Sequence, residues 1–407
     1  MRIVRLSTVE GDVQIDRNVG DGYEKALANL PITQGVKLCA GRDGRAEVEF
    51  EDGSTVRIVP GAEVEFPQLS LRDSGTRVST VNLLQGTAYV DFNGDKSDEF
   101  IVSFGRESAR LAGSARFRLE MDKSNAALAV FKGKVMVDGP FGNVEVGKKQ
   151  TASFDFADSD RSTLAKNVEE APFDQWDKRQ DQYHDSYLAR NNYGSPYAYG
   201  VSDLNYYGNF FSVPGYGMVW QPYFTGVGWD PFMNGAWCWY PGFGYMWVSS
   251  YPWGWMPYRY GSWLFASPYG WVWQPGGFGA GWNRVPRLVN APSRFTMPQA
   301  PTGPGRTTLV VNRNSFVPTR GPSTNRMVIR NDSAGLGIPR GALRNPAKVS
   351  REVIRQGSVT TRIQAPAARA TPTPVPTAGS QPASRPVPTA SSPSSGGSGS
   401  RMGSAPR

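Results

Sequence analysis

The stretch RAEVEFEDGSTVRIV, residues 45–59, decides the fold class of the first part of the chain. In it the apolar side chains of Ala46 and Val48 alternate with the acidic side chains of Glu47 and Glu49. Successive side chains of a strand point to opposite faces, so this period of two predicts a strand with one apolar and one charged face. The letters EDGS then form a turn that reverses the chain into a second alternating run. We therefore expect a β-hairpin whose glutamates lie on a solvated face.

The same pattern of short alternating runs extends over residues 1–156. Turn signals separate the runs about every 8–12 residues, which is typical of a β-sandwich or a barrel. Runs of this kind are AEVEF, VNLLQGTAYVDF, SARFRLEM, AALAVFKGKVMV and NVEVG. We predict that residues 1–156 form one domain of mainly β structure, and this length is sufficient for a hydrophobic core.

Residues 157–205 are predicted to be a linker that contains one helix, at about residues 172–190. The aromatic side chains of Trp176 and Tyr183 recur there at helical spacing, and a proline precedes them at a position suited to a helix start. His184, the only histidine of the chain, falls in this helix. We expect it on the solvated face of the helix.

Residues 206–282 hold 28 of the 49 aromatic residues and 11 of the 12 tryptophans, with only two charged side chains. The segment is an internal repeat, because GNFFSVPGYGMVW, GAWCWYPGFGYMW and GSWLFASPYGWVW align without gaps. Each copy begins with glycine, contains a Tyr-Gly or Phe-Gly pair and closes on tryptophan. These matches predict three aromatic β-hairpins that stack on one another, because a lone hairpin is only marginally stable in water.

The aromatic rings of this segment have three interpretations. They form the core of small repeats, since each buried ring removes about 150–250 Å² from water. Alternatively, some rings stay exposed and stack on sugars or on a protein partner. The third interpretation is contact with a membrane interface. A membrane-spanning element is excluded, because the strands are too short and the Gly/Pro breaks too frequent. If a ligand stacks here, the candidate residues are Trp220, Trp229, Trp237, Trp247, Trp255, Trp263 and Trp273.

The basic residues of the chain are concentrated near its C-terminal end. Residues 284–407 contain 18 Lys and Arg residues and two acidic residues, whereas residues 1–283 carry a net charge of −7. We predict a basic, partly ordered segment at 283–364 and a disordered tail rich in Pro, Ser and Arg at 365–407. We expect a solvated extension without a fixed ligand; alternatively, anionic envelope polymers or lipid head groups suit this charge, and no motif for specific nucleic-acid binding is present.

The sequence contains no catalytic constellation and no metal-binding cluster. One histidine and two distant cysteines leave no Cys/His pair, and the motifs G-x-S-x-G and G-x-x-x-x-G-K-[ST] are absent. The acidic loop DFNGDKSDE, residues 91–99, does not have a glycine and a distal glutamate at the spacing of the helix-loop-helix calcium motif, so we expect a solvated hairpin loop. We predict that the protein is not an enzyme and that it uses no cofactor or metal. Cys39 and Cys238 are expected to be unpaired.

Six stretches within residues 3–155 together resemble a FecR domain. They are VEGDVQI, LCAGRDGRAEVEFEDGSTVRIVPGAEVEF, LLQGTAYVDF, ARLAGSARFRLE, AALAVFKGKVMVDG and VEVGKKQTASF. The aromatic repeat resembles an uncharacterised Trp/Tyr/Pro/Gly-rich domain that accompanies FecR domains in bacterial envelope proteins and has no known activity. The resemblance implies a jelly-roll-like β-sandwich that acts outside the bacterial cytoplasm.

Two functions remain open. The first is a non-catalytic cell-envelope binding or scaffold protein that recognises a polysaccharide, peptidoglycan or a protein partner. The second is a component of an extracytoplasmic signal-transduction pathway of the FecR/sigma-factor type. In signalling members of the family, a cytoplasmic segment and one membrane span precede the domain; neither is found in this sequence. We expect a periplasmic or otherwise extracytoplasmic protein whose signal peptide lies upstream of the recorded start. The ligand and the oligomeric state stay open.

Overall fold

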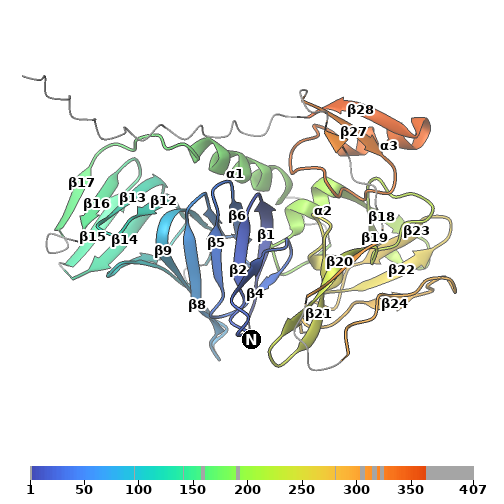
Figure 1. The fold of residues 1–407 in the computed structure, drawn as a ribbon, viewed down its shortest axis with the longest axis horizontal. Coiled ribbons are helices and arrows are strands. Elements are labelled where there is room, and N and C mark those ends of the chain that lie inside the picture. Colours follow the sequence, from blue (N-terminus) through green and yellow to red (C-terminus); the bar gives the residue numbers. More distant parts are fainter. Residues whose placement is uncertain are drawn as a thin grey trace, which may run out of the picture. The chain divides into compact units, whose positions relative to one another are not determined.

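The computed structural model describes residues 2–95, 97–140, 142–156, 161–188, 193–279, 281–302, 308–313, 319–320 and 325–363. The predicted disordered tail at 365–407 lies outside these residues. All described elements belong to one compact unit, Met1–Ala368. They are mainly β, as predicted, and comprise a two-sheet N-terminal sandwich, a connecting helix and aromatic β-hairpins (Figure 1).

The N-terminal sandwich consists of two β-sheets, here called sheet A and sheet B. Across sheet A the strands are β4 (Pro31–Ile32), β1 (Val4–Glu10), β6 (Arg45–Glu49), β7 (Thr55–Ile58), β9 (Arg77–Phe92), β12 (Ala115–Met121), β13 (Asn125–Lys132), β16 (Thr151–Asp155) and β17 (Arg161–Ala165). Across sheet B they are β3 (Tyr23–Lys25), β2 (Val13–Asp16), β5 (Lys37–Ala40), β8 (Glu63–Leu71), β9, β10 (Glu99–Phe104), β11 (Glu107–Leu111), β14 (Lys134–Gly139) and β15 (Gly142–Gly147).

Strand β9 belongs to both sheets. Its first half pairs with β8 and β10 of sheet B, and its second half pairs with β7 and β12 of sheet A. The change of sheet occurs at Gly86, whose φ of 81° lies in the left-handed region that glycine adopts without strain. A Cβ atom at this position would also come within 2.5 Å of the backbone of Ala62. The glycine in LLQGTAYVDF therefore allows one strand to connect the two sheets.

The inward faces of the two sheets form one hydrophobic core. The ring of Phe50, next to β6 of sheet A, lies 4.9 Å from the ring of Phe100 in β10 of sheet B. The ring of Phe104, also in β10, lies 5.4 Å from that of Phe154 in β16 of sheet A. All four side chains are at most 3% exposed. The predicted β-sandwich is present, and its two sheets are open rather than closed into a barrel.

The connecting helix, α1 (Asp174–Leu188), lies across the outer face of sheet A (Figure 1). Its Trp176 packs with Tyr89 of β9 and with Val59 in a small apolar cluster. The Tyr89 hydroxyl also donates a hydrogen bond of 2.9 Å to Asp174 at the start of the helix. The outer face of sheet A is therefore covered by α1 here, and its polar side chains have protein partners instead of water.

The aromatic segment forms three β-hairpins, which we call hairpins 1, 2 and 3. Hairpin 1 pairs β18 (Gly208–Val213) with β19 (Gly217–Pro222), hairpin 2 pairs β20 (Asn234–Tyr240) with β21 (Gly244–Ser249), and hairpin 3 pairs β22 (Ser262–Ala266) with β23 (Gly270–Gln274). A short helix, α2 (Val201–Tyr207), precedes hairpin 1, and a 3₁₀ turn, η1 (Met256–Tyr258), precedes hairpin 3. In every hairpin the first aromatic residue of the repeat lies opposite the closing tryptophan; these pairs are Phe210–Trp220, Trp237–Trp247 and Trp263–Trp273.

The glycine that begins each copy leaves room for the closing tryptophan. In hairpin 2 a Cβ atom on Gly235 would stand 2.4 Å from Cζ2 of Trp247. In hairpin 1 a Cβ atom on Gly208 would stand 2.3 Å from the same atom of Trp220. Real Cβ atoms do not approach ring carbons so closely, because interiors are already close-packed. The spacing of glycine and tryptophan in the repeat is therefore a packing constraint within each hairpin.

Hairpins 1 and 3 share one sheet, whereas hairpin 2 lies in another. Trp220 pairs with Trp273, which joins β19 to β23. The side-chain amide of Gln221 donates to the carbonyl of Tyr269 at 2.7 Å, and that of Gln274 donates to the carbonyl of Tyr216 at 2.5 Å. Each of these glutamines follows the closing tryptophan of its copy, and in hairpin 2 that position is occupied by Val248. Hairpin 2 instead pairs through β20 with β25 (Leu309–Asn312).

The remaining strands follow the aromatic segment. Strand β24 (Arg287–Val289) runs parallel to β22 at the edge of the sheet that hairpins 1 and 3 share. A third small sheet contains β26 (Thr319–Arg320), β27 (Arg326–Arg330) and β28 (Ser358–Arg362), and the helix α3 (Pro346–Gln356) packs beside it. Part of the predicted basic segment is thus folded.

Candidate functional site

The seven tryptophans considered as a stacking surface are all buried. Their exposed fractions are 5% or less; they are Trp220, Trp229, Trp237, Trp247, Trp255, Trp263 and Trp273. Several use the indole N–H inside the protein, as Trp220 does towards the carbonyl of Leu204 and Trp273 towards that of Tyr260. A stacked sugar would need these ring faces at the surface, whereas the described structure packs them in a core. Among the exposed aromatic rings of the repeat is the turn residue Tyr269, at 42%.

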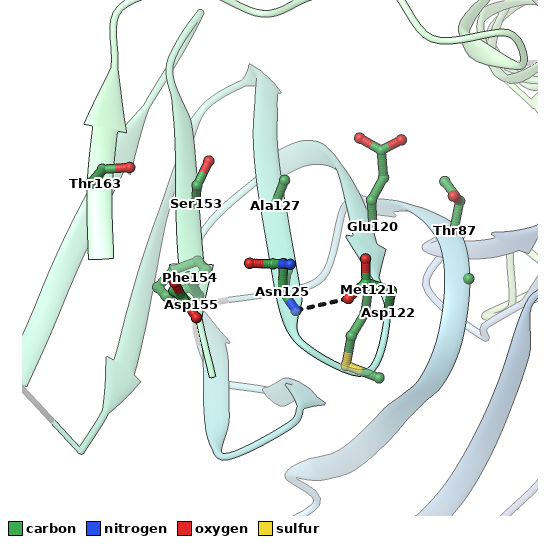
Figure 2. A pocket seen from close by; sticks show the side chains of 12 residues that line it. Thr87, Glu120, Met121, Asp122, Asn125, Ala127, Ser153, Phe154, Asp155 and Thr163 are labelled. Carbon is green, nitrogen blue, oxygen red and sulfur yellow. Dashed lines mark hydrogen bonds between the residues drawn. The ribbon is translucent and has the colours of Figure 1, made fainter. Parts of the chain in front are cut away.

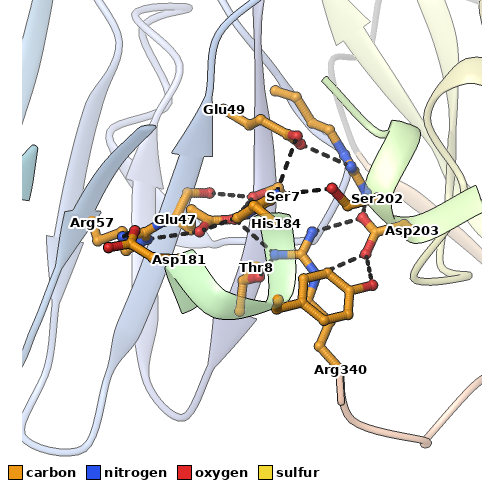
Figure 3. A network of polar contacts seen from close by, with 12 residues as sticks. Ser7, Thr8, Glu47, Glu49, Arg57, Asp181, His184, Ser202, Asp203 and Arg340 are labelled. Carbon is orange, nitrogen blue, oxygen red and sulfur yellow. Dashed lines mark hydrogen bonds and ion pairs between the residues drawn. The ribbon is translucent and has the colours of Figure 1, made fainter. Parts of the chain in front are cut away.

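A buried network of charged side chains joins sheet A to α1, α2 and a C-terminal loop (Figure 3). At its centre is Glu47 of β6, which has no exposed surface. The Glu47 carboxylate accepts hydrogen bonds from Arg57 at 2.8 Å and Arg340 at 2.7 Å, and from the hydroxyl of Ser7 at 2.6 Å. Burial alone raises the pKa of Glu47, but the positive charges of His184, Arg57 and Arg340 hold that pKa well below its usual value.

Arg57 connects Glu47 to the connecting helix. One guanidinium nitrogen of Arg57 donates to both Asp177 and Asp181 of α1, at 2.6 Å each. Arg116 of β12 pairs with the same two carboxylates, at 2.9 Å and 2.7 Å. Burial raises the pKa of Asp181 to about 6, although Arg57 acts against this. The basic outer face of sheet A thus holds the acidic side of α1.

Arg340 connects the network to α2 and to a segment far along the chain. Two of its nitrogens form a bidentate pair with Asp203 of α2, at 2.8 Å and 2.6 Å. The third nitrogen donates to Glu47 and, at 2.6 Å, to the hydroxyl of Thr8. Arg340 is therefore a single side chain that bridges β1, β6 and α2. Bidentate guanidinium–carboxylate pairs of this kind are among the stronger polar contacts in proteins.

A second arginine, Arg5 of β1, extends the network towards hairpin 2. It pairs with Glu49 at 3.0 Å, and it donates to Asn29 and to the backbone carbonyl of Pro252, both at 2.8 Å. The amide of Asn29 in turn donates to the carbonyl of Tyr251 at 2.8 Å. The N-terminal sandwich thus contacts the aromatic domain through buried, directional hydrogen bonds.

His184 of α1 lies inside this network. Its Nε2 atom is 3.1 Å from the Glu47 carboxylate, and its Nδ1 atom is 3.2 Å from the hydroxyl of Ser202. Burial by itself lowers the pKa of His184, but the negative charges of Glu47 and Glu49 outweigh this, so the pKa lies above its ordinary value of 6.5. A protonated imidazole donates from both nitrogens, which suits acceptors on both sides.

With all five carboxylates of the network ionised, its charges balance when the imidazole is protonated. The acidic members are five: Glu47, Glu49, Asp177, Asp181 and Asp203. The basic members are four arginines, Arg5, Arg57, Arg116 and Arg340, together with His184. A buried charge without a partner lowers the free energy of unfolding by roughly 3–5 kcal/mol. Protonation of His184 is therefore part of the stability of this junction.

Two expectations about these residues were wrong. Glu47 and Glu49 do lie opposite Ala46 and Val48, but they are buried at 0% and 1% exposure instead of solvated. His184 is also enclosed, with its side chain 12% exposed. The reason is the same in each case: α1 and α2 cover the outer face of sheet A. Alternation identifies which side chains share a face, but not what lies on that face.

A signal for this covering was present in the sequence. Asp174, Asp177 and Asp181 are spaced by three and four residues, so they share one side of a helix. On sheet A the strands present basic side chains on their outer face, such as Arg118, which pairs with Asp174 at 2.7 Å. An acidic helix side and a basic sheet face are complementary. The pairing of the two could have been proposed from the sequence.

An open cavity of about 560 Å³ lies elsewhere, beside the β12–β13 turn (Figure 2). Its lining is mixed: apolar side chains such as Met121 and Phe154 lie beside polar ones such as Glu120, Ser153 and Asp155. The Asp122 carboxylate is already used, since it accepts the backbone N–H of Asn125 at 2.8 Å within the turn. The lining supplies hydroxyl and carboxylate groups without histidine, cysteine or lysine, so it offers no nucleophile–base pair of the usual kinds.

Comparisons with known proteins identify two families in the chain. The family model described as FecR protein matches residues 37–136, and the family of unknown function DUF6600 matches residues 201–302. Glu47 lies in the first match and Asp203 in the second, so the buried network connects the two matched regions. A search of curated proteins gives no match.

Two crystal structures, each titled as that of a "putative anti-sigma factor from Parabacteroides distasonis", also match. The identities are 19% and 18%, and each match covers 32% of this chain, with a TM-score of 0.29. The matched part spans 59% of the length of those structures.

Proposed function

We propose that this chain, a FecR-domain protein with a second domain of unknown function, is a non-catalytic component of an extracytoplasmic signal-transduction pathway. The family match at residues 37–136 supports this function more than it supports an envelope scaffold. In this proposal the chain acts through a protein partner, and it acts outside the cytoplasm, as the family resemblance implies. None of the helices in the described ranges is long and apolar enough to cross a membrane.

The observation that carries the proposal is the buried network around Glu47. A relay protein needs its domains to respond to one another, and coupling of this kind requires an element whose state both domains influence. Glu47 of the FecR match and Asp203 of the second match bind the same side chain, Arg340. A displacement of β6 would therefore strain the contacts of α2, and the reverse also holds.

The scaffold function receives less support from the structure. That hypothesis relied on exposed aromatic rings that stack on a polysaccharide or on peptidoglycan. The seven tryptophans that would supply the rings are buried. Their size and packing instead serve the stability of the aromatic domain, as large buried rings commonly do.

The proposal is tested in the host bacterium by deleting the gene and measuring transcripts. Deletion is expected to change a defined set of transcripts, and the wild-type protein supplied in trans is expected to restore them. Arg340→Met should fail to restore them although the protein accumulates in the envelope fraction. Lys134→Ala is the matched control, because it also removes one positive charge but at an exposed ion pair with Glu145.

Two results would count against the proposal. An unchanged transcript profile in the deletion strain would exclude a signalling role under the conditions tested. Full restoration by an accumulated Arg340→Met protein would exclude the network as the coupling element. Mass spectrometry of the mature N-terminus, combined with cell fractionation, tests the extracytoplasmic location separately.

A further inference from the structure

The segment 325–363 is a small basic subdomain that lies outside both family matches. It contains β27, β28 and α3 (Figure 1). Seven of its basic side chains are exposed: Arg326, Arg330, Arg344, Lys348, Arg351, Arg355 and Arg362. Its acidic residues are only Asp332 and Glu352. A surface on which basic side chains greatly outnumber acidic ones attracts anions over several ångströms at moderate ionic strength.

Helix α3 arranges its side chains in two opposite faces. Ser350 and Val353 are buried against the rest of the subdomain. Lys348, Arg351 and Arg355 are spaced by three and four residues, so they form one exposed basic stripe. Among the described residues, Lys348 alone of these three has an acidic partner, Glu352 at 4.0 Å. The two arginines therefore remain available to an external anion.

An isoleucine stands beside this basic stripe. Ile354 is 65% exposed. In the sequence of α3 it lies three residues after Arg351 and directly before Arg355. At 100° per residue, Ile354 lies 60° from Arg351 on the helix surface, by the geometry of about 3.6 residues per turn. A large aliphatic side chain next to cations is characteristic of helices that lie on anionic membrane surfaces.

The sheet of the subdomain adds a second basic feature. Arg326 of β27 lies directly opposite Arg362 of β28, and both side chains are exposed. Like charges at directly opposed positions destabilise a pair of strands. The pair becomes favourable when an anionic group lies near both guanidinium groups, because each then gains a charge-assisted hydrogen bond.

We propose that the basic subdomain at 325–363 binds the surface of an anionic lipid bilayer, with α3 as the contacting helix. Arg351 and Arg355 pair with lipid phosphate groups, and Ile354 inserts between the head groups. A soluble polyanion would explain the arginines equally well, but it would gain nothing from an exposed isoleucine. Arg340, in the same segment, reaches Glu47 of the FecR domain. The bound subdomain is therefore connected to the sandwich through the buried side chain of Arg340.

The test uses the full chain and sedimentation with lipid vesicles. Vesicles of equal parts phosphatidylglycerol and phosphatidylcholine should bind the protein at low salt, and vesicles of phosphatidylcholine alone should not. The double variant Arg351→Ala/Arg355→Ala should bind about thirtyfold more weakly, at about 1 kcal/mol per basic residue near the surface. The matched control is Arg110→Ala/Lys134→Ala, which removes the same charge from exposed ion pairs of the sandwich and should bind like the wild type.

A second variant separates a membrane from a soluble polyanion. Ile354→Ser should weaken binding to the anionic vesicles about fivefold, because apolar insertion is lost, and should leave retention on a heparin column unchanged. The proposal is overturned if the double arginine variant binds the vesicles like its control. It is also overturned if Ile354→Ser leaves vesicle binding unchanged while heparin retention depends on Arg351 and Arg355. The five replaced side chains, Arg110, Lys134, Arg351, Ile354 and Arg355, are exposed, so the variants are expected to keep the fold, and thermal unfolding checks this.

Discussion

Trp220 of hairpin 1 pairs directly with Trp273 of hairpin 3, and the two residues hold the same position in the repeat. Around this pair the glutamine contacts are reciprocal, from Gln221 to Tyr269 and from Gln274 to Tyr216. Equivalent residues thus make equivalent contacts in both directions, which is the signature of a two-fold interface. The chain contains an approximate internal two-fold relationship between hairpins 1 and 3, and hairpin 2 is excluded from it.

Replacement of Trp273 by alanine is expected to destabilise the protein by about 3–5 kcal/mol, the usual cost of a large cavity in a core. Trp273 has no exposed surface, and its indole N–H donates a buried hydrogen bond of 2.8 Å to the carbonyl of Tyr260, which the alanine cannot replace. Urea unfolding followed by circular dichroism measures the change. Tyr269→Ala is the control, since that ring is 42% exposed, and its cost should stay below about 1 kcal/mol. Equal costs for the two variants would contradict the core assignment.

Gly235→Ala is expected to destabilise hairpin 2 by about 1–3 kcal/mol, the typical effect of overpacking. The added methyl group would stand 2.4 Å from a ring carbon of Trp247, which is itself buried. Gly228→Ala provides a matched control in the same domain, because a Cβ atom there meets nothing within 4 Å. Thermal unfolding of both variants gives the comparison. A Gly235 variant as stable as the Gly228 variant would show that the glycine has another role.

Arg340→Met is expected to cost about 3–5 kcal/mol of folding free energy, because it leaves Glu47 and Asp203 buried without their shared cation. The methionine side chain retains much of the volume, so the loss reports mainly on charge. Lys134→Ala, in an ion pair whose lysine is 71% exposed, should cost less than about 1 kcal/mol. Both free energies come from urea titrations at neutral pH. A cost below about 1 kcal/mol for Arg340→Met would mean that the network does not hold the junction.

Stability is expected to fall as pH rises through the pKa of His184. That pKa is raised in the folded protein, mainly by Glu47, so the folded state keeps a proton that the unfolded state has lost. The stabilisation is complete below about pH 6.5, the unfolded pKa, and disappears above the folded pKa. Glu47 acts in the opposite direction. Because its pKa is lowered in the folded protein, the stability that it contributes is lost as pH falls below about 4.5.

The variant His184→Gln measures this contribution. Glutamine can donate a hydrogen bond to Glu47 but does not titrate, so the decrease in stability above about pH 6.5 should become smaller. Asp181, whose pKa is raised to about 6, contributes a further decrease in stability in both proteins as pH rises from about 4 to about 6. The measurement is the melting temperature across the pH range. Parallel profiles for wild type and variant would assign the pH dependence to other groups.

Much of the secondary structure could be predicted because it depends on local patterns. The alternation at Ala46 and Val48 depends only on strand geometry, and the repeat spacing depends on contacts within one hairpin, such as Gly235 with Trp247. The helix at Asp174–Leu188 followed from aromatic spacing for the same reason. In each case the residues that determine the element lie within a few tens of positions of one another.

The part of the buried network around Arg340 could not be predicted in this way, because its members are distant in sequence. Arg340 and Glu47 are 293 residues apart, and no local pattern marks either as buried. The choice of partners among the hairpins also depends on tertiary contacts. In retrospect, valine at position 248, where Gln221 and Gln274 stand in the other copies, distinguishes hairpin 2.

The position of Arg340 also has a consequence for synthesis of the chain on the ribosome. The strand that carries Glu47 leaves the ribosome early, and so does Asp203, but the cation that both need is added near the end. Until then Glu47 retains Arg57 and Asp203 retains Arg5, but the two carboxylates lack the cation that they share. The contact that Arg340 makes with β6 and α2 therefore forms last during synthesis, after the rest of the network.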